Sequence, residues 1–205
     1  MSINTYLPSL KESPSQTAGP YVHIGLTPNW SGLTGVYPED LGRQVIKDGV
    51  KGERIKVNVK IVDGGNNPVA DCVVETWQAD AGGIYNSPAD HRGPADPNFN
   101  GWGRFAAEED GTFSFDTIKP GPVPATNGAL QAPHITMWIV ARGINIGLMT
   151  RMYFGDEEAA NAKDPVLAKA RMIGRDKTMI ATREGDTFTF NIYLQGENET
   201  VFLDV

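Results

Sequence analysis

The chain has 205 residues, of which 40% are hydrophobic, enough for one large domain or two small ones with a real core. Its net charge is −7 and it contains no basic cluster, which argues against binding to nucleic acid or to an anionic membrane surface. No segment approaches the roughly 18 apolar residues of a membrane span, and the N-terminus has no signal-peptide pattern, so we expect a cytoplasmic protein.

The first 25 residues predict an irregular arm that packs on a partner. Prolines and glycines interrupt the segment, yet it also carries Tyr21, Val22 and Ile24, which a solvated tail would rarely contain. We therefore divide the chain into an arm, residues 1–25, and a single domain, residues 26–205.

Alternating side chains predict β-strands along the rest of the chain. Residues 54–61 and 187–194 both alternate apolar and polar side chains with a period of two. The other patterns predict strands at 73–77, 112–115, 134–141 and 149–154, short helices at 156–162 and 165–170, and a long irregular loop at 80–103. Together these elements predict an all-β protein that forms a single β-sandwich with long loops, short helical segments and an N-terminal arm.

His134 opens one predicted strand, and Thr136 follows on the same face because strands repeat every second residue. A His-x-His pair would aim two imidazoles at one ion, whereas His-x-Thr aims only one. Metal sites need three or more protein ligands, so a core histidine bonded to backbone is the ordinary alternative. The sequence thus carries the surroundings of a metal site with too few ligands to hold the metal.

Three further features suit binding chemistry, and each has an ordinary alternative. Tyr85 carries a phenol whose anion is a ligand suited to ferric iron, but it could equally be a half-buried loop tyrosine. Arg142 follows an apolar strand, where its guanidinium serves either a structural salt bridge or a site for a carboxylate. Gly19 would let the backbone approach another molecule closely, or it could belong to an unremarkable loop.

Short motifs, in their order and number, resemble the intradiol ring-cleavage dioxygenases from about residue 12 to the C-terminus. They are Pro-Ser-Gln-Thr-Ala-Gly-Pro-Tyr at 14–21, Glu-Thr-Trp-Gln-Ala-Asp at 75–80, Asp-Pro-Asn-Phe at 96–99, Gly-Trp-Gly-Arg at 101–104, Thr-Ile-Lys-Pro-Gly at 117–121, Ala-Pro-His-Ile at 132–135 and Met-Tyr-Phe at 152–154. The segments 141–146 and 195–202 resemble more closely the non-catalytic chain of a two-chain member of this family.

The resemblance implies a metal centre that has lost ligands. In the catalytic chain of such an enzyme, two tyrosines and two histidines hold a non-haem ferric ion. Tyr85 and His134 match two of these positions, whereas Val123 and Thr136 stand at the other two. Val123 cannot coordinate and Thr136 is a poor ligand for ferric iron, so the resemblance implies that this chain binds no metal and is not catalytic alone.

The resemblance also implies a partner, an iron-bearing chain of similar fold, with several such pairs forming a larger oligomer. The pair would use O2 to open 3,4-dihydroxybenzoate between its hydroxyls, giving 3-carboxy-cis,cis-muconate. This chain would wall the substrate pocket at the boundary with Arg142, Thr17, Gly19, Pro20 and Tyr21. Two alternatives are a metal-free sandwich that binds an aromatic acid or scaffolds another protein, and a self-sufficient enzyme with an unusual metal site.

Overall fold

Two parallel central strands follow directly from the alternating sequence. The computed structural model describes residues 17, 19, 21–125 and 128–204. In it, β1 (Arg54–Val62) pairs in parallel with β10 (Thr187–Tyr193), with Val57 opposite Phe188 and Val59 opposite Phe190. The apolar residue at every second position of both strands is buried, as the period of two predicts.

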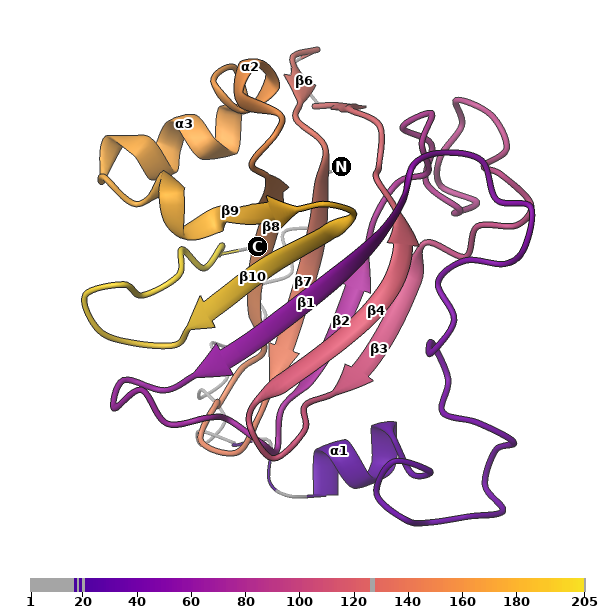
Figure 1. Ribbon diagram of the computed structural model, residues 1–205, viewed down its shortest axis with the longest axis vertical. Coiled ribbons are helices and arrows are strands. Elements are labelled where there is room, and N and C mark those ends of the chain that lie inside the picture. Colours follow the sequence, from indigo (N-terminus) through magenta and orange to yellow (C-terminus); the bar gives the residue numbers. More distant parts are fainter. Residues whose placement is uncertain (1–16, 18, 20, 126–127, 205) are drawn as a thin grey trace, which may run out of the picture.

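The main strands form one eight-stranded sheet in the order β3-β2-β7-β8-β9-β10-β1-β4. Its edge strands β3 and β4 approach each other, so the sheet bends into two facing halves and almost closes (Figure 1). The remaining strands are β2 (Val73–Trp77), β3 (Trp102–Ala106), β4 (Thr112–Ile118), β7 (His134–Val140), β8 (Leu148–Phe154) and β9 (Ile180–Glu184), with β5 (Val123–Pro124) and β6 (Leu130–Gln131) forming a small separate sheet. The predicted all-β sandwich is confirmed.

The two faces of β7 and β8 pack against different surroundings. Ile135, Met137 and Ile139 enter the main core between the two halves of the sheet. The alternate residues face outward, where Tyr153 packs in a smaller cluster with Leu167 of the overlying helix. Because His134 and Thr136 alternate with the core residues, they also lie on this outward side of the sheet.

Three short helices flank the sheet. α1 (Tyr21–Leu26) lies at the opposite end of the sheet from α2 (Glu158–Asn161) and α3 (Pro165–Met172), as Figure 1 shows. The Asp164 carboxylate caps α3 by accepting from the backbone N–H groups of Val166 and Leu167 at 2.8 and 2.9 Å. A 3-10 turn (Asp176–Met179) leads into β9. In the described part of the chain, no helix is long and apolar enough to cross a membrane.

The structure corrects several boundaries. Residues 21–25, predicted to be irregular, belong to α1, and the predicted loop 80–103 overruns the start of β3 at Trp102. The strand predicted at 112–115 continues to Ile118. The sequence missed β5 and β6 because two-residue strands show no periodicity. Most of the arm lies outside the described residues, so its division from the domain at residue 25 stays a prediction.

Candidate functional site

A row of cross-strand neighbours forms the floor of the first candidate site. Trp77 of β2 lies opposite Thr136 of β7, which in turn lies opposite Arg151 of β8. Two residues further along, His134 lies opposite Tyr153. Directly paired residues place their side chains on the same face, so these five outward-facing side chains are close neighbours.

Tyr85 lies above this floor. Its ring stacks on Trp77, with ring centroids 5.8 Å apart and an angle of 3° between the planes. The loop that carries it is fixed by Asp80, whose carboxylate accepts from the backbone N–H groups of Gly82 and Ile84, both at 2.9 Å. Burial raises the pKa of the Tyr85 phenol, and the positive charges of Arg151 and Arg92 oppose this rise only in part.

A close backbone approach holds the Tyr85 loop against the strand that carries Val123. Gly83 has φ +80°, and a Cβ built on it would lie 2.3 Å from the carbonyl oxygen of Pro122. The N–H of Gly121 donates to the carbonyl of Asp80 at 2.8 Å, which ties the same two segments together. Only glycine fits position 83, and this fit brings the Tyr85 loop beside residues 121–123.

His134 is buried as a neutral imidazole. Its Nδ1 lies 2.7 Å from the carbonyl oxygen of Ala132, an acceptor, so Nδ1 carries the proton and Nε2 carries the lone pair. Burial lowers the pKa of His134 to about 4, and the positive charge of Arg151 acts in the same direction. This tautomer would suit metal ligation through Nε2.

The residues of this site do not fit a metal ion. Tyr85 and His134 offer two suitable donors, but Val123 is buried in β5 and Thr136 faces Arg151 across the sheet. Among the described residues, no group of three or more histidine, cysteine, aspartate or glutamate side chains could hold a metal. Two donors fall short of the three or more that protein metal sites use.

The other predicted site residues gather at the far end of β7. Arg142 follows that strand, and its Nε donates to Asp71 Oδ2 at 2.9 Å. The backbone N–H of the next residue, Gly143, donates to Thr17 Oγ1 at 2.9 Å, which anchors this point of the arm to the turn. Gly19 accepts from the N–H of Val22 at 3.1 Å as α1 begins. Pro20 lies outside the described residues.

Arg142 forms a salt bridge with Asp71, the structural alternative that the sequence left open, and its use as a carboxylate site stays a prediction. Its side chain is 65% exposed, because Ala141 is the last buried residue before the turn. Tyr21 is also highly exposed, at 81%. Arg142 and Tyr21 therefore both present unpacked surface at this end of the molecule.

The two groups are far apart. Eight residues of extended chain separate His134 from Arg142, which corresponds to roughly 25 Å along β7. The structure thus brings Tyr85, Val123, His134 and Thr136 together at one end of the strand, and Thr17, Gly19, Tyr21 and Arg142 at the other. No single pocket built from the described residues could use both groups.

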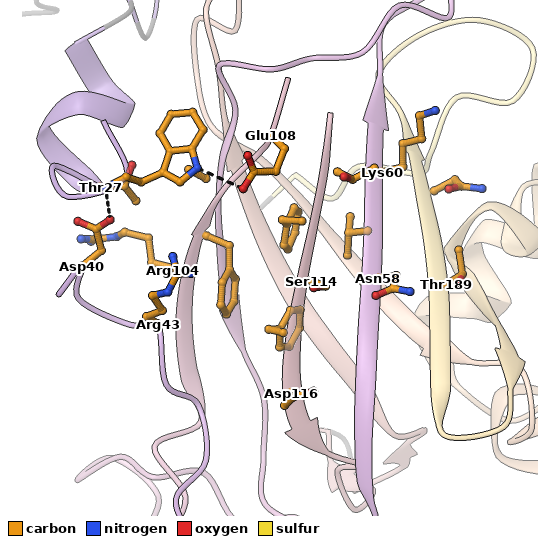
Figure 2. Close-up of a pocket in the computed structure, with 18 residues that line it drawn as sticks. Thr27, Asp40, Arg43, Asn58, Lys60, Arg104, Glu108, Ser114, Asp116 and Thr189 are labelled. Carbon is orange, nitrogen blue, oxygen red and sulfur yellow. Dashed lines mark hydrogen bonds between the residues drawn. The ribbon is translucent and has the colours of Figure 1, made fainter. Parts of the chain in front are cut away.

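A groove lies elsewhere on the molecule. It has a volume of about 670 Å³ and is lined by residues of β1, β3, β4 and β10, with the segment that carries Thr27 and Asp40 at one side (Figure 2). The Asp40 carboxylate accepts from the backbone N–H groups of Asn29 and Trp30, both at 2.8 Å, and Arg104 pairs with Glu75 at 2.6 Å. None of the sequence-predicted site residues lines this groove. Arg104 Nη1 also donates to the carbonyl oxygen of Leu26 at 3.3 Å, which ties the end of α1 to β3.

Two important residues escaped the sequence analysis. Arg151 breaks the otherwise apolar end of β8, a signal that could have been noticed. Asp164 stands just before Pro165, a pattern typical of a helix start. It is fully buried and accepts from the Ala132 N–H at 2.9 Å and from the Tyr153 hydroxyl at 3.0 Å. The same carboxylate thus caps α3 and positions the segment that leads into His134.

Comparisons with known proteins agree with this architecture. A family model described as "Dioxygenase" matches residues 27–196. The chain is 43% identical over 200 residues to the protocatechuate 3,4-dioxygenase alpha chain of Pseudomonas putida, covering 95% of this chain and 97% of that protein. It is 35% identical to the alpha chain of Burkholderia cepacia, over 96% of this chain and 99% of that one.

A beta chain and a solved structure also match. The protocatechuate 3,4-dioxygenase beta chain of Burkholderia cepacia is 35% identical over 177 residues, covering 81% of this chain and 75% of that protein. The structure of an intradiol ring-cleavage dioxygenase from Tetranychus urticae matches with a TM-score of 0.58 at 20% identity, over 78% of this chain and 89% of that one. The structural likeness supports the fold.

Proposed function

Because the chain belongs to the intradiol dioxygenase family, we propose that it is the non-catalytic alpha subunit of a protocatechuate 3,4-dioxygenase. The observation that carries this proposal is the separation of the two groups along β7. One end retains only two of the family's four metal-ligand positions as donors. The other end presents Arg142 and the anchored arm at the surface, where they can contact a neighbouring chain.

The proposed partner is the beta chain, which would hold the non-haem Fe(III) and carry out the ring cleavage of 3,4-dihydroxybenzoate with O2. The match of this chain to a beta chain over most of its length supports a partner of the same fold. Two chains of similar fold can pair about a pseudo-twofold axis, since each then offers the other an equivalent surface. Repetition of that pair would give a larger oligomer.

Arg142 would bind the carboxylate of the substrate. Only its Nε is engaged among the described residues, by Asp71, so the rest of the guanidinium can pair with a further anion. A guanidinium forms two parallel hydrogen bonds with a carboxylate. In a protein of net charge −7, such a group would orient an aromatic acid and offset the general repulsion of anions.

The arm would complete the wall of the partner's pocket. The Gly143–Thr17 hydrogen bond holds the arm beside Arg142, so Thr17, Gly19, Pro20 and Tyr21 would follow one another along the pocket boundary. Gly19 lacks a side chain and would allow the backbone to approach an aromatic ring. Tyr21, exposed at 81%, would become buried only when the two chains associate.

Further exposed apolar residues support an obligate partner. Between α1 and β1, the side chains of Leu33, Val36, Tyr37 and Leu41 are all 41–58% exposed. Clustered apolar surface of this kind promotes association. We therefore expect the chain to be stable in a complex and to self-associate when it is produced alone, and we expect the complex to reside in the cytoplasm.

Co-expression with a beta chain tests the proposal. The two chains should co-purify as one oligomer in sedimentation analysis, and this oligomer should cleave 3,4-dihydroxybenzoate, whereas this chain alone should not. A beta chain that forms no complex with this chain would contradict the proposal. If this chain alone then bound aromatic acids as a monodisperse protein, the metal-free binding module would be the better description.

A further inference from the structure

Arg151 lies beside the group formed by Tyr85, His134 and Thr136. It is the direct partner of Thr136 across the β7–β8 pair, and opposed side chains of such a pair have Cβ atoms about 4.5–5.5 Å apart. Its Nη1 donates to Gln131 Oε1 at 2.7 Å and to the Tyr153 hydroxyl at 3.4 Å. These contacts hold the guanidinium on the outward face of β7 and β8, where His134 also lies.

The charge of Arg151 acts on both remaining donors. It contributes to lowering the pKa of His134, and it opposes the rise in the pKa of Tyr85. Tyr85 comes from the loop after β2 and His134 from the start of β7, so the guanidinium is close to residues from two separate segments. A metal ion bound by the same two donors would have to occupy the same neighbourhood.

This positive charge is not neutralised by an ion pair. Both partners of Nη1 are uncharged oxygen atoms, and Arg151 Nε is buried with no acceptor among the described residues. No carboxylate in the described part of the chain forms an ion pair with Arg151. Asp164 is linked to Arg151 only through the Tyr153 hydroxyl, which donates to Asp164 at 3.0 Å, and its carboxylate already accepts from the Ala132, Val166 and Leu167 N–H groups. A partly buried charge without a direct ion pair repels a second cation more strongly than an exposed one, because less water screens it.

We propose that the Arg151 guanidinium takes the place of the metal ion in this chain, and that Arg151 excludes a metal in addition to the loss of two ligands. The inference rests on the proposed function only in treating positions 85, 123, 134 and 136 as former ligand positions. It predicts that restoring ligands is insufficient while Arg151 remains. Thr136→His, for example, would place the new imidazole directly opposite the guanidinium.

Metal content of two variant pairs tests this inference in the complex with the beta chain. In the first pair, Thr136→His is compared with Thr136→His/Arg151→Gln, and bound Co²⁺ is counted after gel filtration with the wild-type complex as background. In the second pair, the double variant Val123→Tyr/Thr136→His is compared with the triple variant that also carries Arg151→Gln. The iron bound above the wild-type level is counted in both. We expect metal above the background only in the variants in which Arg151 is replaced. The metal affinity of each such variant should be at least about tenfold higher than that of its counterpart that retains Arg151.

Two control variants separate charge from other effects. Arg151→Lys keeps a positive charge and should leave Thr136→His without added cobalt. Arg54→Gln changes the net charge equally at an exposed residue, and it should not promote cobalt binding when combined with Thr136→His. Circular dichroism and thermal unfolding, recorded alongside assembly with the beta chain, report that each variant is folded.

The outcomes are distinct. Equal cobalt binding with and without Arg151, or no cobalt in an assembled Thr136→His/Arg151→Gln complex, would overturn the role of Arg151. If the four-ligand variants fail to assemble, the cobalt pair decides the question, since it introduces a single new ligand. Failure of the wild-type chains to assemble would instead contradict the proposed function.

Discussion

Replacing Arg142 by alanine in the assembled enzyme should reduce turnover far more than stability. In the chain alone, the Arg142 side chain is 65% exposed and pairs with Asp71 at 2.9 Å. Exposed ion pairs contribute about 0–1 kcal/mol, so the variant should unfold within about 1 kcal/mol of the wild type. A charge-assisted hydrogen bond to a substrate carboxylate contributes about 1.5–3 kcal/mol. Its loss would lower kcat/KM by roughly 10- to 100-fold.

The assay compares two substrates and a matched control variant. Kinetics with 3,4-dihydroxybenzoate should show the loss, whereas catechol, which lacks the carboxylate, should be much less affected. Asp71→Asn removes the same surface ion pair but retains the guanidinium, so it should keep most of the activity. The iron content of the wild-type, Arg142→Ala and Asp71→Asn complexes should be equal, since in the proposal Arg142 binds the substrate and is not an iron ligand.

Two results would refute this reasoning. An unchanged kcat/KM for 3,4-dihydroxybenzoate in a fully assembled Arg142→Ala complex would remove Arg142 from the substrate site. Equal losses on both substrates, accompanied by equal losses in Asp71→Asn and a lower Tm, would assign Arg142 a purely structural role.

Three further predictions concern the group at the other end of β7. Gly83→Ala should destabilise the protein by at least about 1–2 kcal/mol, since φ is +80° and Pro122 leaves no room, whereas Gly82→Ala should cost less in the same urea titration. His134 has a pKa of 6.5 unfolded and about 4 folded, so the unfolded state takes up the proton first as the pH falls. The free energy of unfolding should therefore drop by about 2 kcal/mol between pH 7 and pH 5, and His134→Gln should show a smaller drop in Tm over this range. Asp164→Ala should lower Tm strongly, because it removes the cap of α3 and the acceptor of the buried Tyr153 hydroxyl.

The sequence predicted the parts of the fold that depend on local periodicity. β1 and β10 each bury one face, so their alternation was readable and their buried residues are as predicted. α3 was readable from its apolar pattern, although its cap, Asp164, was overlooked. By contrast, α1 has no buried residue, and a helix without an apolar stripe leaves little pattern in the sequence.

The motifs placed Tyr85, Val123, His134 and Thr136, and the structure brings the segments that carry them together, whereas their assignment as former ligand positions stays a prediction. The role of Arg151 could not be foreseen, because it depends on the register of β8 against β7, which periodicity alone does not fix. The sequence left open whether Arg142 forms a structural salt bridge, and its partner Asp71, which lies 71 residues away in the sequence, emerges only from the fold.

The metal content of the chain purified alone, set against that of the complex, tests the central claim most directly. The account predicts no stoichiometric iron and no visible tyrosinate-to-iron absorption in the chain alone. In the complex with the beta chain, it predicts a single iron ion for each pair of chains, with the associated colour. A coloured chain that carries stoichiometric iron by itself would contradict the account. Tyr85 and His134 would then be sufficient to bind iron even with Arg151 present.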